Sequence, residues 1–418
     1  MSIRRLSPVR YPGWLLLAIG VLLVHVSWAA SSEHVVYSFS GGADGGDPAS
    51  QLVFDNAGNA YGTTVTGGAD GCGTVFQLTP AGGGQWQQSV LFSFDCFGEG
   101  KNPYGGVTLD AHGNLYGATV AGGFGGTCSG DGCGVVYELT QSGGTWSETI
   151  LYSFGDSPDV AGPGGGVVFD AAGNLYGTAA DNGTGGFGGI YQLSHTSGGW
   201  SETVIHNFTG GDDGGLGSLG LLLRDASGNF YGVTEIGGHY GAGTVYKISP
   251  ASGGGWNFST LYAFQSQPDA AFPYGGLSAD AYGNLYGTTY YGGTSGAGTV
   301  FKVGPAPNAI GGWRDTVLYS FQGASDGANP TSTLLFDAAH NLYGTTTAGG
   351  DPNCACGVVF ELSPSGNSWI QSVLHTFGTF PDGAAPSYGL TADGAGDYLG
   401  TTPVGGNDNQ GAVFELTP

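Results

Sequence analysis

The chain repeats itself seven times, and this internal repetition restricts its fold more than any other feature of the sequence. An Asp-x-x-Gly-Asn turn, complete or degenerate, recurs at spacings of 55, 60, 55, 55, 57 and 56 residues, beginning at Asp55, Asp110, Asp170, Asp225, Asp280, Asp337 and Asp393. A Tyr-Gly step follows each of the first six turns, and Tyr398-Leu399-Gly400 follows the seventh. Seven copies of one unit span residues 34–418, so the fold must be an array of that unit.

Each copy is predicted to form four short strands. In the first copy, residues 52–54 and 60–64 flank the turn as a hairpin, and residues 74–78 and 86–94 follow. Period-two alternation in the last run predicts one buried face, made of Trp86, Val90, Phe92 and Phe94, and in the second copy of Trp146, Ile150, Tyr152 and Phe154. Helix is disfavoured because 86 of the 418 residues are glycine, each costing a helix about 1 kcal/mol relative to alanine.

Seven four-stranded units predict an all-β fold, a seven-bladed β-propeller as one domain over residues 34–418. The main alternative is a β-solenoid. The last copy stops after its third strand, residues 412–416, while residues 35–39 form an orphan fourth strand near the start. The orphan strand would complete the last blade and close a ring, whereas a solenoid needs capped ends. We therefore expect a propeller closed by pairing of the N-terminal strand with the last blade.

The first 29 residues have the pattern of a secretory signal peptide. Three arginines precede an apolar stretch of residues 14–26, which ends at Ser27-Trp28-Ala29. The apolar stretch is too short for a comfortable membrane span, which needs roughly 20 residues. We expect cleavage, no membrane span afterwards, no C-terminal anchor, and a secreted, periplasmic or extracellular protein.

Charge and cysteine content agree with export. After cleavage, five basic residues face 32 acidic ones, a formal charge of −27, which is the wrong sign for a nucleic-acid partner. Six cysteines fit an oxidising compartment, where they would form disulfides. Among the 15 connectivities, strand order favours Cys72–Cys96, and proximity in sequence favours Cys128–Cys133 and Cys354–Cys356. No zinc site is expected from them, because four clustered ligands are lacking.

The motifs of the repeat resemble a known family. Gly-Asn-Leu-Tyr-Gly-Thr-Thr, Gly-Thr-Val-Phe and Trp-x-x-x-Val-Leu-Tyr-Ser-Phe are similar to the GloVer tandem repeat, named for Gloeobacter and Verrucomicrobia. The resemblance covers essentially the whole mature chain. It implies an exported bacterial repeat protein of uncharacterised function, and it supplies no catalytic residues.

The main candidate ligand site is a set of seven acids, one per copy, each five residues after the phenylalanine that ends the fourth strand. They are Asp44, Glu99, Asp159, Asp213, Asp269, Asp326 and Asp382. We expect them on one face, near the mouth of the channel. Two interpretations stay open: each acid caps its own turn, or together they form a rim that binds a polyol or a cation. Ca²⁺ is the ion that such a rim would suit, and no other cofactor is expected.

No catalytic constellation stands out in the sequence. His206 and His375 occupy a position that other copies fill with tyrosine or phenylalanine, so we interpret them as packing residues. No histidine stands at metal-ligand spacing from another, and we expect no metal site at the histidines. Catalytic residues stay unassigned, and an enzyme is not favoured.

We expect a monomeric, non-catalytic recognition or scaffold propeller that binds glycans or proteins at the bacterial surface or outside the cell. The alternative is a polysaccharide-acting lyase or hydrolase, which rests on analogy with other propellers. A convergent pocket that breaks the seven-fold pattern would favour the enzyme, and an even rim would favour binding.

Overall fold

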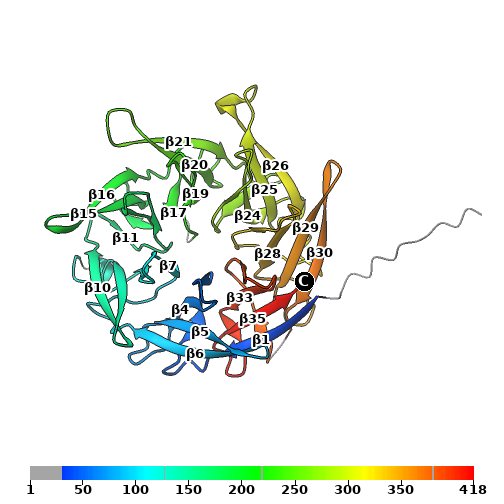
Figure 1. Ribbon diagram of the computed structural model, residues 1–418. Helices are drawn as coiled ribbons and strands as arrows, with labels where there is room; N and C mark the ends of the chain where they lie inside the picture. The colour runs from blue at the N-terminus through cyan, green and yellow to red at the C-terminus, as the bar shows by residue number, and fades with distance from the viewer. Residues whose placement is uncertain (1–30, 127, 218–219, 379–380) are drawn as a thin grey trace, which may run out of the picture. The chain divides into compact units, whose positions relative to one another are not determined.

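Seven antiparallel sheets follow one another around a ring in the computed structural model of the chain (Figure 1). The structure describes residues 31–126, 128–217, 220–378 and 381–418. The expected signal peptide, residues 1–29, lies outside the described residues. Each sheet has four strand positions from its inner to its outer edge, which confirms the seven-bladed propeller. No helix within the described ranges is long and apolar enough to cross a membrane.

The strands of each blade occupy four positions, counted from the ring axis outward, and their labels follow chain order. The inner position holds β2 (Gly46–Pro48), β3 (Val53–Phe54), β7 (Val107–Leu109), β11 (Val160–Ala161), β12 (Val168–Phe169), β17 (Gly215–Gly217), β18 (Leu223–Arg224), β22 (Ala270–Pro273), β23 (Ser278–Ala279), β27 (Leu335–Phe336), β31 (Gly383–Ala384) and β32 (Thr391–Ala392). The second position holds β4 (Ala60–Thr66), β8 (Leu115–Thr119), β13 (Leu175–Ala179), β14 (Asp181–Asn182), β19 (Phe230–Ile236), β24 (Leu285–Gly292), β28 (Leu342–Thr346), β33 (Tyr398–Thr402) and β34 (Val404–Gly405).

The outer half of each blade is a longer hairpin. Its third strands are β5 (Thr74–Gly82), β9 (Val135–Ser142), β15 (Gly189–Thr196), β20 (Thr244–Pro250), β25 (Thr299–Pro305), β29 (Val358–Ser365) and β35 (Ala412–Thr417). Its fourth strands are β6 (Gln85–Ser93), β10 (Thr145–Ser153), β16 (Gly199–Asn207), β21 (Trp256–Ala263), β26 (Trp313–Ser320), β30 (Ser368–Thr376) and, for the last blade, β1 (Ser32–Ser38). Two short 3₁₀ turns, η1 (Cys128–Gly130) and η2 (Ile310–Gly312), lie in connections.

The N-terminal strand closes the ring as the orphan strand predicts. β1 pairs antiparallel with β35, with Val35 opposite Phe414 and Ser38 opposite Ala412 (Figure 1). Phe39, which follows β1, is fully buried. Strands from the two ends of the described chain therefore lie in one sheet.

Aromatic pairs fill the seams between neighbouring blades. The phenylalanine that follows each fourth strand packs against an aromatic residue on the third strand of the next blade, with ring centroids 4.9–5.5 Å apart. The pairs are Phe39–Phe76, Phe94–Tyr137, Phe154–Tyr191, Phe208–Tyr246, Phe264–Phe301, Phe321–Phe360 and Phe377–Phe414. Such contacts stabilise a core beyond the apolar area they bury.

The sequence predicts that alternate residues of the fourth strand form one buried face, and this prediction is wrong at one position of the repeat. Val90 is 37% exposed and Ile150 is 36% exposed, although both share the parity of the buried phenylalanines. The reason is a β-bulge: Val75 pairs with Phe92 while its neighbour Phe76 pairs with Val90, which leaves Leu91 unpaired. Because a bulge inserts one residue into one strand, the side chains before it change face.

Three disulfides tie loops of the described chain. They join Cys72 to Cys96, Cys128 to Cys133 and Cys354 to Cys356, which are the pairs that strand order and loop position favour. The first links the segment just before β5 to the segment after β6, two points that antiparallel pairing brings together. All six cysteines are used.

Candidate functional site

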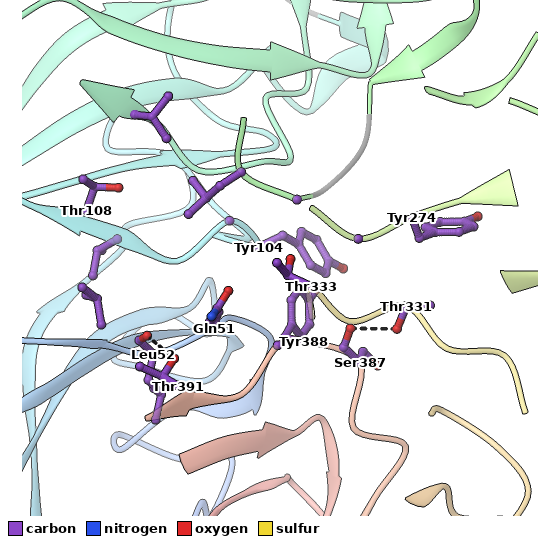
Figure 2. Close-up of a pocket in the computed structure, with 18 of the residues that line it drawn as sticks. Gln51, Leu52, Tyr104, Thr108, Tyr274, Thr331, Thr333, Ser387, Tyr388 and Thr391 are labelled. Carbon is purple, nitrogen blue, oxygen red and sulfur yellow. Dashed lines mark hydrogen bonds between the residues drawn. The ribbon is translucent and has the colours of Figure 1, made fainter. Parts of the chain in front are cut away.

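A cavity of about 830 Å³ lies on the axis of the ring, and all seven blades contribute to its wall. Seven of the lining residues, one from each blade in order, are Gln51, Tyr104, Val168, Leu221, Tyr274, Thr331 and Tyr388. Figure 2 shows several of these side chains around the cavity. The volume lies in the range of small-molecule sites, which hold a few polar groups in a largely apolar and aromatic lining.

The sequence builds this wall where the inner strand is interrupted. In five blades a residue with positive φ stands immediately before a proline: Asp47, Asn102, Phe272, Asn329 and Ala385, with φ between 55° and 58°. In the first and fifth blades the proline is the last paired residue of its strand, opposite Thr64 and Thr289 respectively. Proline has no N–H to donate, and the residue before it is restricted as well. The segment after the proline is therefore free of strand pairing and faces the axis.

Hydrogen bonds between blades fix the wall. The hydroxyl of Thr391 donates to the Leu52 carbonyl at 2.7 Å, and that of Thr331 donates to the Ser387 carbonyl at 2.7 Å (Figure 2). Gln51 reaches across a seam as well, because its Nε2 donates to the Leu390 carbonyl at 3.0 Å. These bonds join the inner segments of consecutive blades, so the lining is organised before any ligand arrives.

Tyr104 and Tyr388 form one side of the cavity, near the Asp47 carboxylate. Both rings lie beside Thr333 in the middle of Figure 2. Burial and the Asp47 charge raise the pKa of Tyr104, and burial, Tyr104 and Asp47 together raise the pKa of Tyr388. Both phenols are therefore neutral at physiological pH and can donate a hydrogen bond to a ligand.

Glu235 and Tyr274 form a second polar group, where blades four and five meet. The Tyr274 hydroxyl lies close to the Glu235 carboxylate. Burial raises the pKa of Glu235 to about 7, although the nearby Tyr274 hydroxyl lowers it, and burial with the Glu235 charge raises the pKa of Tyr274 to about 12. A carboxyl group with a pKa near 7 can give or accept a proton under physiological conditions.

An aromatic track leads from the cavity wall to the surface. Tyr274 contacts Tyr290 with ring centroids 5.6 Å apart, Tyr290 contacts Tyr291 at 4.6 Å, and Tyr291 contacts Phe272 at 5.9 Å. Tyr274 and Tyr290 line the cavity, whereas Tyr291 is 50% exposed. A ligand longer than the cavity could therefore follow aromatic faces outward.

The cavity residues were not identified from the sequence, although a signal for them exists. Glu235 and Tyr290 occupy the position after the last paired residue of the second strand, where the other blades carry Val65, Val120, Ala180, Thr347 and Pro403. Tyr104 and Tyr274 follow a proline that other blades follow with a small residue or threonine. Residues that break a repeat at one position indicate function, because the fold itself needs no change there.

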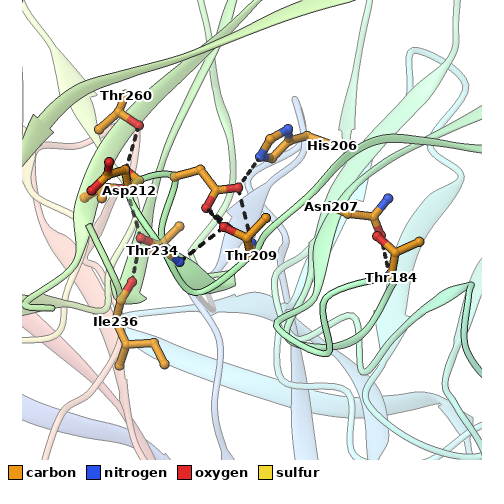
Figure 3. Close-up of polar contacts among 11 residues, drawn as sticks. Thr184, His206, Asn207, Thr209, Asp212, Thr234, Ile236 and Thr260 are labelled. Carbon is orange, nitrogen blue, oxygen red and sulfur yellow. Dashed lines mark hydrogen bonds and ion pairs between the residues drawn. The ribbon is translucent and has the colours of Figure 1, made fainter. Parts of the chain in front are cut away.

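The seven predicted rim acids lie elsewhere, by the fourth strands, and none is among the described residues that line the axial cavity. In six turns the carboxylate contacts the side chain seven residues earlier: Tyr37, Tyr152, His206, Tyr262, Tyr319 or His375. Figure 3 shows His206 and Thr209, both of which contact the carboxylate of Asp213. In the second turn Phe92 has no hydroxyl to offer, and Glu99 replaces the aspartate.

The acids of the Asp-x-x-Gly-Asn turns hold their hairpins. Asp55 Oδ1 accepts hydrogen bonds from the backbone N–H groups of Ala57 and Asn59, and Oδ2 accepts bonds from the side chains of Asn59 and Tyr61. Burial raises the pKa of Asp55, but these bonds prevail, and the pKa lies below its usual value. The recurring turn and the Tyr-Gly step thus form one structural unit.

Solved structures with this fold are similar over most of the chain. A GH74 xyloglucanase from Xanthomonas campestris has a TM-score of 0.51 and 16% identity, covering 92% of this chain and 55% of its own. A putative 6-phosphogluconolactonase from Bacteroides uniformis has a TM-score of 0.50 and 11% identity, covering 82% and 88%. A protein of unknown function from Dyadobacter fermentans has a TM-score of 0.48 and 11% identity, covering 93% and 99%. At these identities, the first two structures show the fold alone, and the third supports no conclusion about this chain.

Sequence comparison gives one family. Its model, described as the Gloeobacter/Verrucomicrobia repeat, matches residues 20–129, 122–314 and 309–418. No curated protein matches the chain.

Proposed function

We propose that this chain, which belongs to the Gloeobacter/Verrucomicrobia repeat family, is an exported propeller that binds a neutral glycan in its axial cavity. The axial cavity is the observation that carries this proposal. Its lining combines four tyrosines with hydroxyl and amide side chains such as Thr108, Thr333 and Gln51. Flat aromatic faces suit the C–H faces of pyranose rings, and neutral hydroxyl groups suit their alcohols.

Charge favours a neutral or amino sugar over an acidic one. The mature chain has a formal charge of −27. The carboxylate of Asp47 lies near Tyr104 and Tyr388, and Glu235 lies against Tyr274. A uronic acid or a sulfated sugar would meet like charge at both places, which disfavours its entry.

We expect Tyr104→Ala to weaken binding of a neutral oligosaccharide at least tenfold, because it removes an aromatic face and a free hydroxyl from the wall. The ligand would first be found on an array of neutral, uronic-acid and sulfated glycans, and its affinity measured by calorimetry. Tyr282→Ala is the matched control, since Tyr282 is 86% exposed in a hairpin turn. Binding of neutral glycans that survives Tyr104→Ala unchanged would remove the cavity from the proposal.

A polysaccharide-acting enzyme is the second candidate, and Glu235 is the observation that favours it. This acid breaks the seven-fold pattern beside the cavity, and its pKa of about 7 suits proton transfer. Incubation of the mature protein with the same polysaccharides, followed by reducing-end and unsaturated-product assays, tests this candidate. If it is an enzyme, we expect Glu235→Gln to lower turnover at least 100-fold while leaving oligosaccharide affinity within about threefold. Unchanged turnover in that variant would exclude Glu235 as the acid or base.

A further inference from the structure

The seam that closes the ring brings together three side chains that can ligate a metal ion. His375 lies on β30, Asp382 in the turn that follows, and Glu33 on β1 from the other end of the chain. His375 Nε2 is 3.3 Å from Asp382 Oδ2 and 3.6 Å from Glu33 Oε2. One ligand atom from each residue lies within 4.8 Å of the other two.

These separations also suit ligands of one ion. The distance of 3.6 Å between His375 and Glu33 is too long for a hydrogen bond, and the hydrogen bond between His375 and Asp382 is a long one at 3.3 Å. Zinc binds nitrogen and oxygen ligands at about 2.0–2.2 Å, which places neighbouring ligands of a tetrahedral site about 3.4 Å apart. The imidazole therefore stands at ligand spacing from both carboxylates.

A matched seam in the same chain holds a histidine without a carboxylate at the position of Glu33. His206 occupies the equivalent place in the third blade, and its Nε2 is 2.9 Å from Asp213 Oδ2, an ordinary hydrogen bond. At the position of Glu33 that seam has Phe258, whose ring stacks on the imidazole at 3.9 Å. The closing seam thus differs by a longer contact and an added carboxylate.

Glu33 supplies a second observation. Its side chain is only 8% exposed. Its Oε1 is buried and has no hydrogen-bond partner among the residues that the structure describes. The acids at the same strand position in three other blades, Glu148, Glu202 and Asp315, also have a buried oxygen without a partner in the described chain, but of these four acids Glu33 alone has an imidazole beside it. A buried carboxylate oxygen without a partner is costly, and a bound cation would remove that cost. Two carboxylates and a neutral imidazole carry the charge that one divalent ion balances.

The site is also reachable from solvent. A cleft of about 570 Å³ opens at this seam, and Glu33, Asp382 and Asn407 are among its lining residues. An ion could enter through the cleft, and water could complete its coordination.

We propose that Glu33, His375 and Asp382 bind one divalent transition-metal ion of the Zn²⁺ or Mn²⁺ type, which joins the N-terminal strand to the sixth blade. Calcium fits less well, because it takes six to eight oxygen ligands and this site offers two carboxylates and a nitrogen. Imidazole suits zinc and its neighbours in the first transition row. Sequence spacing could not reveal the site, because Glu33 and Asp382 lie at opposite ends of the chain.

The test uses the untagged mature protein, freed of metal with a chelator, and titrated with Zn²⁺, Mn²⁺ or Ca²⁺ by calorimetry. We expect one saturable Zn²⁺ or Mn²⁺ site per chain and a melting temperature that rises by several degrees when it is filled. His375→Tyr should weaken binding at least tenfold. This variant restores the residue that Tyr37, Tyr152, Tyr262 and Tyr319 provide in other blades, so the contact with Asp382 is kept.

Two further variants keep the test decisive. Glu33→Gln should also weaken binding at least tenfold, and glutamine is native to this position at Gln88 and Gln371, so the fold is not at risk. His206→Tyr is the matched control and should bind zinc as the parent does. Co²⁺ substitution should give the absorption of a four-coordinate site that His375→Tyr abolishes. Absence of saturable binding, equal binding by His375→Tyr, or binding of Ca²⁺ alone would overturn the proposal.

Discussion

A chain that begins at residue 40 is expected to lose its single cooperative thermal transition and to self-associate, whereas a chain that begins at residue 30 should unfold in one step as a monomer. The shorter chain lacks β1, so the outer edge of β35 has no strand to pair with. It also lacks Phe39, whose ring is fully buried against Phe76. Loss of one such ring alone costs about 3–5 kcal/mol, and an open edge invites pairing with another chain.

Scanning calorimetry and light scattering after size-exclusion chromatography measure both effects. The synthetic peptide of residues 31–39 is the control, because its addition should restore part of the lost stability if the strand acts by pairing. An equal melting temperature for both chains would mean that β1 contributes nothing to closure.

The free energy of unfolding is expected to fall by several kcal/mol as the pH rises from 5 to 9. Buried carboxyls on the fourth strands of three blades cause this loss. Burial, together with the charges of Glu99 and Asp95, raises the pKa of Glu148 to about 8. Burial and Asp159 raise that of Glu202 to about 7, and burial and Asp269 raise that of Asp315 to about 8.

The sign follows from the protonated form. Each carboxyl is protonated in the folded chain at pH 5 and largely ionised in the unfolded chain, so its stabilising contribution is complete only below its unfolded pKa. That contribution is lost as the pH rises through 7 to 8. Each pKa unit is worth about 1.4 kcal/mol. Glu148 and Asp315 each contribute up to about 4 kcal/mol to the loss between pH 5 and 9, and Glu202, which is the least buried of the three, contributes less because solvent screens its charge.

Neighbouring blades provide the matched variants. Gln88 and Gln371 occupy the same strand position, and each donates its Nε2 hydrogen to a backbone carbonyl, of Asp44 and Asp326 respectively, at 3.2 Å. A triple variant, Glu148→Gln, Glu202→Gln and Asp315→Asn, should therefore fold and should lose much less stability than the parent between pH 5 and 9; Glu33 and Glu235, whose pKa values burial raises to about 7, account for the loss that remains. Denaturant titrations at five pH values measure this. A parent whose stability rises with pH over that range would contradict the assignment.

The repeat predicted the architecture well because its signals are local and occur seven times. The Asp55 turn, the Tyr61-Gly62 step and the strand endings each follow from a short pattern, and the missing strand at one end has its match at the other. The bulge at Leu91 could not be predicted from such a short pattern. Alternation gives the face of a side chain only while the two strands keep register.

The axial cavity could not be predicted for a different reason. Its residues come in short groups from all seven blades, and no motif along the chain joins one group to another. The fold is predicted from the residues that the seven copies share. Glu235 and Tyr290 differ from the other copies at their position, so the shared residues do not reveal them. The same holds at the closing seam, where Glu33 meets His375 only after the ring has formed.

The pairing of β1 with β35 has a consequence for the timing of folding. The first strand to be synthesised can find its partner only after nearly the whole chain has been made, since Ser38 lies opposite Ala412. Contacts of such long sequence separation form slowly, because a large loop entropy must be overcome first. A chain that ends before β35 leaves β1 without a strand to pair with. Ring closure thereby distinguishes complete chains from incomplete ones, and proteases that attack open strands would remove the incomplete ones first.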